Sequence, residues 1–230
     1  MPCTVALLAH TPHPDELVAA AARICYRDVT AADLLAGERE SLSEALLDQL
    51  WRSGHLSTFE HASFTFAVDG LSRVASHQLV RHRMASFSQQ SQRYVRMTGS
   101  SVIVPPSVAD MPEAEALFRR QSEASFAAYR RLVELGVPAE DARFILPHGW
   151  ETRLVLTMNA RELHHFFHLR LCRRAQWEIR ALARRMLLLC RQEAPVLFKK
   201  AGPSCIFGAC GEVKPCGRPF KDMEDLLVED

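Results

Sequence analysis

The sequence contains no acidic residue between Asp69 and Asp110, although arginine occurs five times in that interval. Protein surfaces usually mix both signs of charge, so this absence predicts a concentrated positive field. Lysine is also scarce, since only four of the 28 basic residues are lysine. A GC-rich genome would explain part of that bias, and a basic solvated helix end is the alternative interpretation of the cluster. The planar fork of arginine, however, suits phosphate and carboxylate, and the interval therefore favours a site for small anions.

Other features are missing, and each absence excludes a class of protein. No run approaches the roughly 20 apolar residues of a membrane helix, and the first residues lack a basic leader, so we expect a cytoplasmic protein without a secretory signal. Seven cysteines, an odd number, do not form a disulfide framework. The composition, 48% hydrophobic with a net charge of +1, is that of a globular protein. Without repeats or linkers, residues 1–230 are expected to form a single catalytic domain, with a tail rich in Gly, Pro and Cys over 202–230.

Familiar nucleotide-binding and hydrolase motifs are absent as well. No GxGxxG follows a predicted strand, no Walker lysine is present, and no GxSxG elbow occurs. A dinucleotide would therefore need a different architecture.

Hydrophobic periodicity predicts helices combined with a few strands. Alternation predicts strands over 4–10, 62–70, 101–106 and 152–159. Helical spacing predicts helices over 14–26, 41–53, 71–83, 113–135 and 175–193, with a short one after Pro138. Asn159, followed three residues later by Glu162, predicts an N-cap and a capping box for a helix over 160–170. The expected class is α+β, a mixed sheet with packed helices.

Three groups of residues in this pattern could form a binding or catalytic site. Short polar side chains follow the arginines of residues 73–96, as in a phosphate or nucleobase site. A nucleic-acid-binding protein using residues 73–96 is an alternative, but only Phe87 and Tyr94 are interleaved and the chain is near neutral. His164 and His168 are four apart and share a helix face, which keeps a zinc hydrolase open, although His165 stands where that signature has Glu. Cys205, Cys210 and Cys216 would need a fourth ligand to hold a metal.

The stretch "RHRMASFSQQSQRY" (81–94) resembles the RHR-x₇-S signature of the flavin-dependent thymidylate synthases, with Arg81, His82, Arg83 and Ser91 at the signature positions. The resemblance extends in order to "GHLSTFEH", "DARFILP" and "NARELHHFFHLRLCRRAQWEIR", and to "AARICY" and "AGPSC" near the ends. It covers most of the chain. One position differs, because Gln89 stands where the family often has Glu, which leaves the role of residue 89 open.

The resemblance implies a methyltransferase that converts dUMP to dTMP, with methylenetetrahydrofolate as carbon donor and NADPH reducing a bound FAD. It also implies a homotetramer with sites shared between subunits, and an α+β fold. From the spacing of the His and Cys residues we expect no metal ion. The implied residues around dUMP are Gln78, Arg81, Gln89, Gln90, Ser91, Gln92, Arg93, Arg143 and Arg170. The implied residues around FAD are Ser57, Glu60, Arg81, His82, Arg83, Met84, Asn159, Arg161 and His165.

Two of these residues have chemistry that can be argued further. In the family, Arg170 would stabilise the ionised N3 side of the uracil, a task that suits a permanently charged guanidinium. Ser91 invites the interpretation of a nucleophile, but a serine needs a neighbouring base, and the nearby arginines cannot accept a proton. We therefore interpret Ser91 as a group that binds the substrate.

Overall fold

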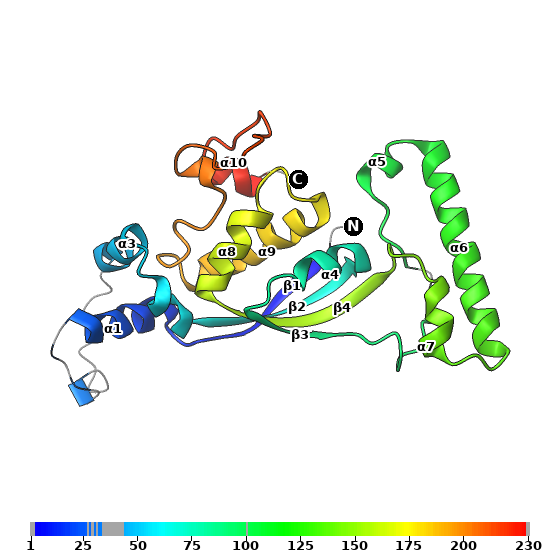
Figure 1. The fold of residues 1–230 in the computed structure, drawn as a ribbon, viewed down its shortest axis with the longest axis horizontal. Coiled ribbons are helices and arrows are strands. Elements are labelled where there is room, and N and C mark those ends of the chain that lie inside the picture. Colours follow the sequence, from blue (N-terminus) through cyan, green and yellow to red (C-terminus); the bar gives the residue numbers. More distant parts are fainter. Residues whose placement is uncertain are drawn as a thin grey trace.

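The computed structural model describes residues 3–26, 28, 30, 32–33, 44–99 and 101–228. Figure 1 shows an elongated molecule with a sheet at its centre, a helical pair at one end and a long helix at the other. The strands are β1 (Thr4–His10), β2 (Ser63–Ser72), β3 (Ala85–Gln89) and β4 (Glu151–Asn159). The helical segments are α1 (Pro14–Tyr26), α3 (Glu44–Ser53), η1 (Leu56–His61), α4 (Arg73–Leu79), α5 (Pro106–Ala109), α6 (Pro112–Glu134), α7 (Ala139–Ala142), η2 (Arg143–Ile145), α8 (Ala160–Arg170), α9 (Trp177–Glu193), η3 (Ser204–Ile206) and α10 (Met223–Val228).

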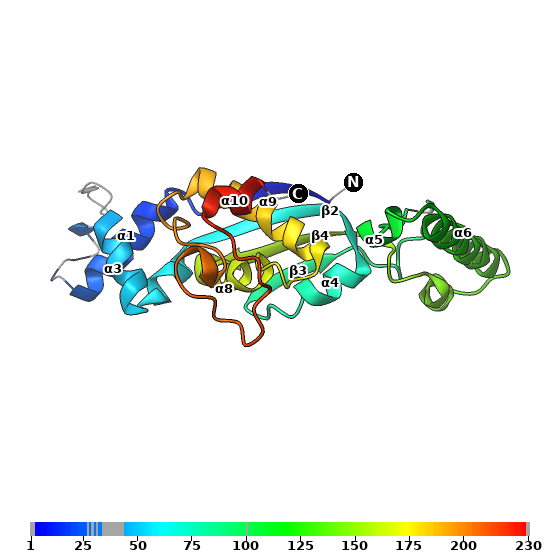
Figure 2. The ribbon, with the colours of Figure 1, turned by 90° about the horizontal axis from the view of Figure 1, so that it is seen from above.

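The sheet has the order β1-β2-β4-β3, and each of these pairings is antiparallel. The α+β class is confirmed, with an antiparallel sheet where a mixed one was expected. In β2 and β4 the side chains alternate, so Phe64, Phe66 and Leu156 are fully buried while Thr65 and Thr157 lie on the other face. Helices α8 and α9 cover the buried face, as both views show (Figure 1, Figure 2). Each large apolar side chain buried there stabilises the fold by roughly 1.5–3 kcal/mol.

Most predicted elements are confirmed, and the differences have local causes. The predicted strand over 101–106 is wrong, because this proline-stopped segment forms only an isolated bridge between Val102 and Trp150. The helix predicted over 71–83 begins later, since β2 continues to Ser72 and the Ser72 side chain caps Ala75. Part of the helix predicted over 41–53 lies outside the described residues, and α3 is described from Glu44. Strand β3 was not predicted, because five residues at a sheet edge give a weak alternation.

Polar contacts also fix the backbone after α9. The carboxylate of Asp15 in α1 accepts hydrogen bonds from the backbone N–H groups of Val196 (3.1 Å) and Leu197 (2.8 Å). From the other side, His164 Nε2 lies 2.9 Å from the carbonyl oxygen of Leu197. Two elements distant in sequence therefore hold the backbone of Leu197, one through its N–H and the other through its carbonyl oxygen. In the described part of the chain, no helix is long and apolar enough to cross a membrane.

Candidate active site

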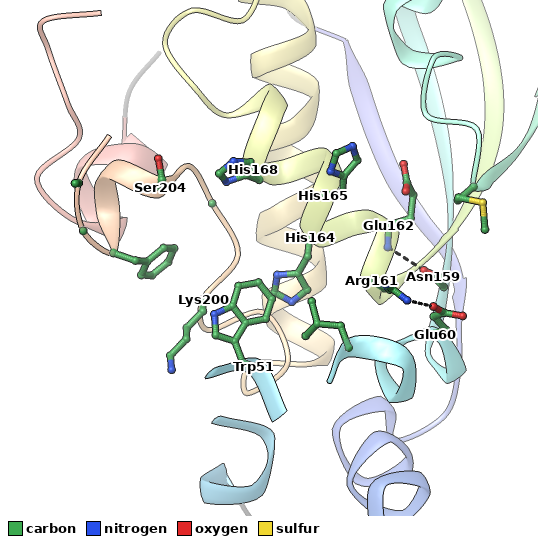
Figure 3. Close-up of a pocket in the computed structure, with 16 residues that line it drawn as sticks. Trp51, Glu60, Asn159, Arg161, Glu162, His164, His165, His168, Lys200 and Ser204 are labelled. Carbon is green, nitrogen blue, oxygen red and sulfur yellow. Dashed lines mark hydrogen bonds and ion pairs between the residues drawn. The ribbon is translucent and has the colours of Figure 1, made fainter. Parts of the chain in front are cut away.

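A cavity of about 920 Å³ lies between α8, the α3–η1 region and the segment after Lys200 (Figure 3). Arg161, His165 and His168 line it from α8, at spacings that place them on one helix face. The opposite face of α8 buries Leu163, Phe166 and Phe167 in the core. The hydrophobic side of this helix thus fixes its position, and its basic side faces the cavity. The volume is typical of small-molecule sites.

The expected FAD residues are only partly brought together by this cavity. Five of them line it, namely Glu60, Met84, Asn159, Arg161 and His165. Arg161 Nη1 donates to Glu60 Oε1 at 2.5 Å, and both side chains are about half exposed. Ser57 lies in an adjoining cavity of about 310 Å³ that also contacts Arg161. Arg81 and Arg83 are exposed outside both cavities, and His82 is buried.

His82 lies at the centre of a buried hydrogen-bond chain. Arg170 Nε donates to His82 Nε2 at 3.0 Å, so that ring nitrogen carries no proton. The other ring nitrogen, Nδ1, therefore carries the proton and donates to Glu162 Oε1 at 3.0 Å. Arg170 Nη2 also donates to the carbonyl oxygen of Gln78 at 3.4 Å. The chain fixes both the tautomer of His82 and the orientation of the Arg170 guanidinium.

The electrostatics of this chain keep His82 neutral. Burial lowers the pKa of His82, the Glu162 carboxylate opposes that shift, and the neighbouring Arg170 adds to it. Burial also lowers the pKa of Arg170, although a guanidinium remains charged at any physiological pH. The charged guanidinium of Arg170, at the end of α8, therefore lies beside the neutral ring of His82.

A second buried carboxylate fixes the start of α4. Both oxygens of Glu178, in the first turn of α9, accept hydrogen bonds from Ser72, one from its backbone N–H and one from its hydroxyl, each at 2.6 Å. The Ser72 hydroxyl in turn accepts from the N–H of Ala75 at 3.0 Å. Arg73 is the next residue, so this contact fixes the backbone position from which the Arg73 side chain extends.

Several expected dUMP residues gather around Arg73. Arg73 Nη2 donates to the carbonyl oxygen of Gln90 at 3.5 Å, and Arg73 Nε is buried without a partner among the described residues. Burial, and secondarily the charge of Arg143, lowers the pKa of Arg73. Arg143 Nε donates to the carbonyl oxygen of Glu140, whose carboxylate pairs with Arg93 at 2.5 Å. Two guanidinium groups thus lie close together, which is an arrangement suited to an anion.

The remaining expected dUMP residues are placed along β3 and the turn that follows it. Gln89 Nε2 donates to Thr152 Oγ1 at 3.1 Å, across the β3–β4 pair. The Ser91 hydroxyl accepts from the backbone N–H of Arg93 at 3.1 Å, and Gln92 is half-buried in the same turn. Among the described residues, the Ser91 hydroxyl makes no hydrogen bond to a side chain that could act as a general base. One group of these residues therefore lies at the start of α4, around Arg73, and another at its end, with Gln78 and Arg170.

Sequence reasoning missed three residues that organise the site. Glu162 was interpreted as a capping-box partner, and Asn159 does cap the Glu162 N–H at 2.9 Å, but the Glu162 side chain binds His82 instead. Arg73 was counted only as part of the basic stretch, and Glu178 was not noticed. The position of Glu178 on the apolar face of its helix is a weak indication that it is buried. Its partner, Ser72, is too distant in sequence to be predicted.

The zinc alternative based on His164 and His168 is not supported. His164 is buried, and it donates through Nε2 to the Leu197 carbonyl oxygen. Burial lowers its pKa to about 4, so the ring is neutral. His168 is exposed on the cavity side of α8. Across the residues that the structure describes, no three His, Cys, Asp or Glu side chains are arranged to hold a metal ion.

Comparisons with known proteins agree on one family. The Thy1 family model, described as thymidylate synthase complementing protein, matches residues 6–196. The flavin-dependent thymidylate synthase of Geobacter sulfurreducens is 54% identical, with 95% of this chain and 98% of that protein covered. That of Nitratidesulfovibrio vulgaris is 49% identical, with 93% and 94% covered. A solved structure of the UMP/dUMP methylase PolB from Streptomyces cacaoi with 5-Br dUMP is similar, with a TM-score of 0.75, 30% identity, and 86% and 93% covered. The chain therefore belongs to the family of flavin-dependent thymidylate synthases.

Proposed function

We propose that this enzyme converts dUMP to dTMP, taking the carbon from methylenetetrahydrofolate and the reducing equivalents from NADPH through bound FAD. The observation that carries the proposal is the chain Glu162–His82–Arg170, which presents an oriented guanidinium close to the cavity-lining helix face. Family membership supplies the reaction class, and this geometry supplies a group suited to it.

The residues around the large cavity fit FAD. Arg161, His165 and Lys200 supply donors for a pyrophosphate, and Trp51 and Phe207 supply aromatic surface for a flavin or adenine ring. Asn159 and Glu60 add polar groups at the same wall. A flavin held there would supply the redox chemistry between NADPH and the pyrimidine, and the chain's own residues would position it and shield it from water.

Arg170 is the residue we assign to the uracil. Its Nε and Nη2 atoms are held by His82 and the Gln78 carbonyl oxygen, whereas Nη1 makes no hydrogen bond among the described residues. Nη1 is therefore the donor available to a ligand. A guanidinium held in place stabilises negative charge at N3 without reorganising, which polarises the ring for reaction at C5.

The phosphate of dUMP would lie near Arg73 and Arg143. Both groups are cationic, they lie close to each other, and one of them has a buried donor without a partner in the described ranges. Gln90, Ser91 and Gln92 lie on the adjoining turn. Ser91 is a binding hydroxyl in this scheme, not a nucleophile.

The expected homotetramer would explain why some arginines of the basic stretch are exposed and lack a partner among the described residues. The side chains of Arg81, Arg83 and Arg96 have neither an ion pair nor a hydrogen bond among the described residues, and they are exposed. A neighbouring subunit would complete sites that include them. The whole chain, 1–230, would act as a single catalytic domain in the cytoplasm.

Spectroscopy of the purified protein tests this proposal. We expect a flavin absorbance spectrum that NADPH bleaches, followed by reoxidation when dUMP and methylenetetrahydrofolate are added together, with dTMP as the product. Protein that cannot be loaded with FAD would contradict the cofactor assignment. FAD-loaded protein that forms no dTMP from this mixture would contradict the reaction.

The nucleic-acid alternative makes a different prediction. A nucleic-acid-binding protein would retain oligonucleotides with an affinity that rises with length and falls steeply with salt. We expect binding of free dUMP and none of oligonucleotides at physiological salt. The opposite result would favour the alternative.

A further inference from the structure

Four of the seven cysteines surround one small cavity at the base of the C-terminal tail. Its volume is about 140 Å³, and it is lined by Cys172, Cys205, Cys210 and Cys216. All four are free thiols. Three of them come from the tail, and Cys172, which sequence spacing did not associate with them, comes from the turn between α8 and α9. The fold therefore supplies the fourth sulfur that the tail alone lacked.

Two of these cysteines have a backbone donor two residues later in the chain. The backbone N–H of Arg218 donates to the sulfur of Cys216 at 3.4 Å, across Gly217, whose φ of +74° favours glycine. The backbone N–H of Arg174 hydrogen-bonds the sulfur of Cys172. Donors of this kind orient sulfur ligands around a metal ion.

The tail is already attached to the α8–α9 turn by polar contacts. Arg174 donates to the carbonyl oxygen of Lys214 and lies 3.9 Å from the carboxylate of Glu212. Arg173 lies over the ring of Phe220 at 4.2 Å and pairs with Asp225 at 3.6 Å. These contacts hold the tail against the turn that carries Cys172.

The described side chains do not converge to metal-binding distances. Residues 207–219 are exposed and contain neither helix nor strand, and metal binding would require this segment to bring the sulfurs to the roughly 2.3 Å from zinc that Zn–S bonds need.

We propose that Cys172, Cys205, Cys210 and Cys216 form a tetrathiolate site for Zn²⁺ that fastens the tail to the α8–α9 turn. The four thiols release four protons as four Zn–S bonds form, and no oxidant or reductant takes part. Four sulfur ligands with no open position are typical of a structural zinc site, and soft thiolates select zinc over magnesium or calcium.

The position of this site links it to the large cavity. Ser204, Phe207, Gly208 and Ala209 line that cavity and lie between or beside the tail cysteines. Cys172 follows Arg170 by two residues. A zinc ion here would therefore restrain both a wall of the cavity and the end of α8.

Metal analysis of the purified wild-type chain tests the proposal, after expression in zinc-supplemented medium. We expect about one zinc ion per chain, released when an organomercurial modifies the thiols. Replacement by Co²⁺ should give the sulfur-to-cobalt charge-transfer and d–d absorption of a tetrahedral thiolate site. Chain without zinc that also fails to bind added Zn²⁺ or Co²⁺ would overturn the proposal, and so would a mass deficit of two hydrogens, which would indicate a disulfide.

Substitutions identify the ligands. Cys216→Ser and Cys210→Ser alter exposed residues, so the fold should persist, while zinc content should fall several-fold. Cys25→Ser is the matched control, because Cys25 is exposed but distant from the cavity, and it should retain zinc. Zinc retained in both ligand variants, or lost equally in the control, would contradict the assignment.

Discussion

The α8 wall of the cavity and the basic segment of residues 73–96 differ in how far a single chain completes them. The α8 wall is anchored by buried contacts, since His82 and His164 are each only 4% exposed and both are hydrogen-bonded. The basic segment presents Arg81, Arg83 and Arg96 to solvent without partners among the described residues. The α8 wall is fixed by folding, whereas the arginines of the basic segment are exposed to solvent. Substitutions in the α8 wall should alter stability or catalysis, and substitutions in the basic segment should alter binding.

The largest effect is expected at Arg170, which ends α8 and is hydrogen-bonded to His82 of the basic segment. Arg170→Ala should reduce turnover by about 2.7–4 kcal/mol, roughly 10²–10³-fold in kcat, because it removes the oriented positive group. Flavin content should change far less. Steady-state kinetics and the absorbance spectrum of the same preparation measure both. Arg153→Ala is a suitable control, since Arg153 is an exposed arginine paired with Asp69. Unchanged turnover would remove Arg170 from the mechanism.

The next effect concerns stability on the buried side of α8. Burial lowers the pKa of His164 from 6.5 to about 4. Between pH 4 and pH 6.5 this ring is therefore protonated in the unfolded chain but neutral in the folded chain. The free energy of unfolding should therefore fall as the pH drops from 6.5 to 4, by at most about 3 kcal/mol. His164→Gln retains a donor for the Leu197 carbonyl oxygen and should flatten this dependence. Denaturant titrations at several pH values measure it, and equal slopes in both proteins would refute the explanation.

A smaller effect is expected at Glu162, which acts through His82. Glu162→Gln keeps an acceptor for His82 Nδ1 but removes the negative charge beside the His82–Arg170 pair. We expect a loss of about 1.5 kcal/mol, roughly tenfold in kcat, with little change in KM. A role limited to stability would instead lower the melting temperature and leave kcat intact. Comparison of kcat, KM and thermal unfolding in one variant separates these outcomes.

The smallest effect on stability is expected in the basic segment. Arg83→Ala should change the free energy of unfolding by less than about 0.5 kcal/mol, because the side chain is exposed. Retention of flavin through gel filtration should nevertheless weaken. Arg131→Ala, another exposed arginine, controls for loss of charge. A variant that stays fully loaded with FAD would contradict the assignment of Arg83.

Much of the fold could be predicted from local patterns. The strand at 4–10 and the helix at 14–26 match the structure because apolar periodicity and the first-turn acids of that helix agree there. The Asn159 cap was also correct, because a cap depends on residues close in sequence. The isolated bridge at Val102 was mistaken for a strand, since β-branched composition alone does not provide a partner.

The site was less predictable, for a physical reason. Composition indicated an anion site, and resemblance supplied the residue set, but neither gave the contacts. The partner of Glu162 is 80 residues away, and that of Glu178 is 106 residues away. Such pairs are set by tertiary packing, which no local spacing encodes. For the same reason, sequence spacing did not associate Cys172 with the cysteines of the tail.

Leu197, whose backbone is hydrogen-bonded by both α1 and α8, has a consequence for motion. Its N–H is bonded to Asp15 and its carbonyl oxygen to His164, so the amide hydrogens of Val196 and Leu197 should exchange with solvent only when α1 detaches. The first helix and the segment that begins the cavity wall would then open as one cooperative unit. A disturbance near the start of the chain would loosen ligand binding before it unfolded the sheet.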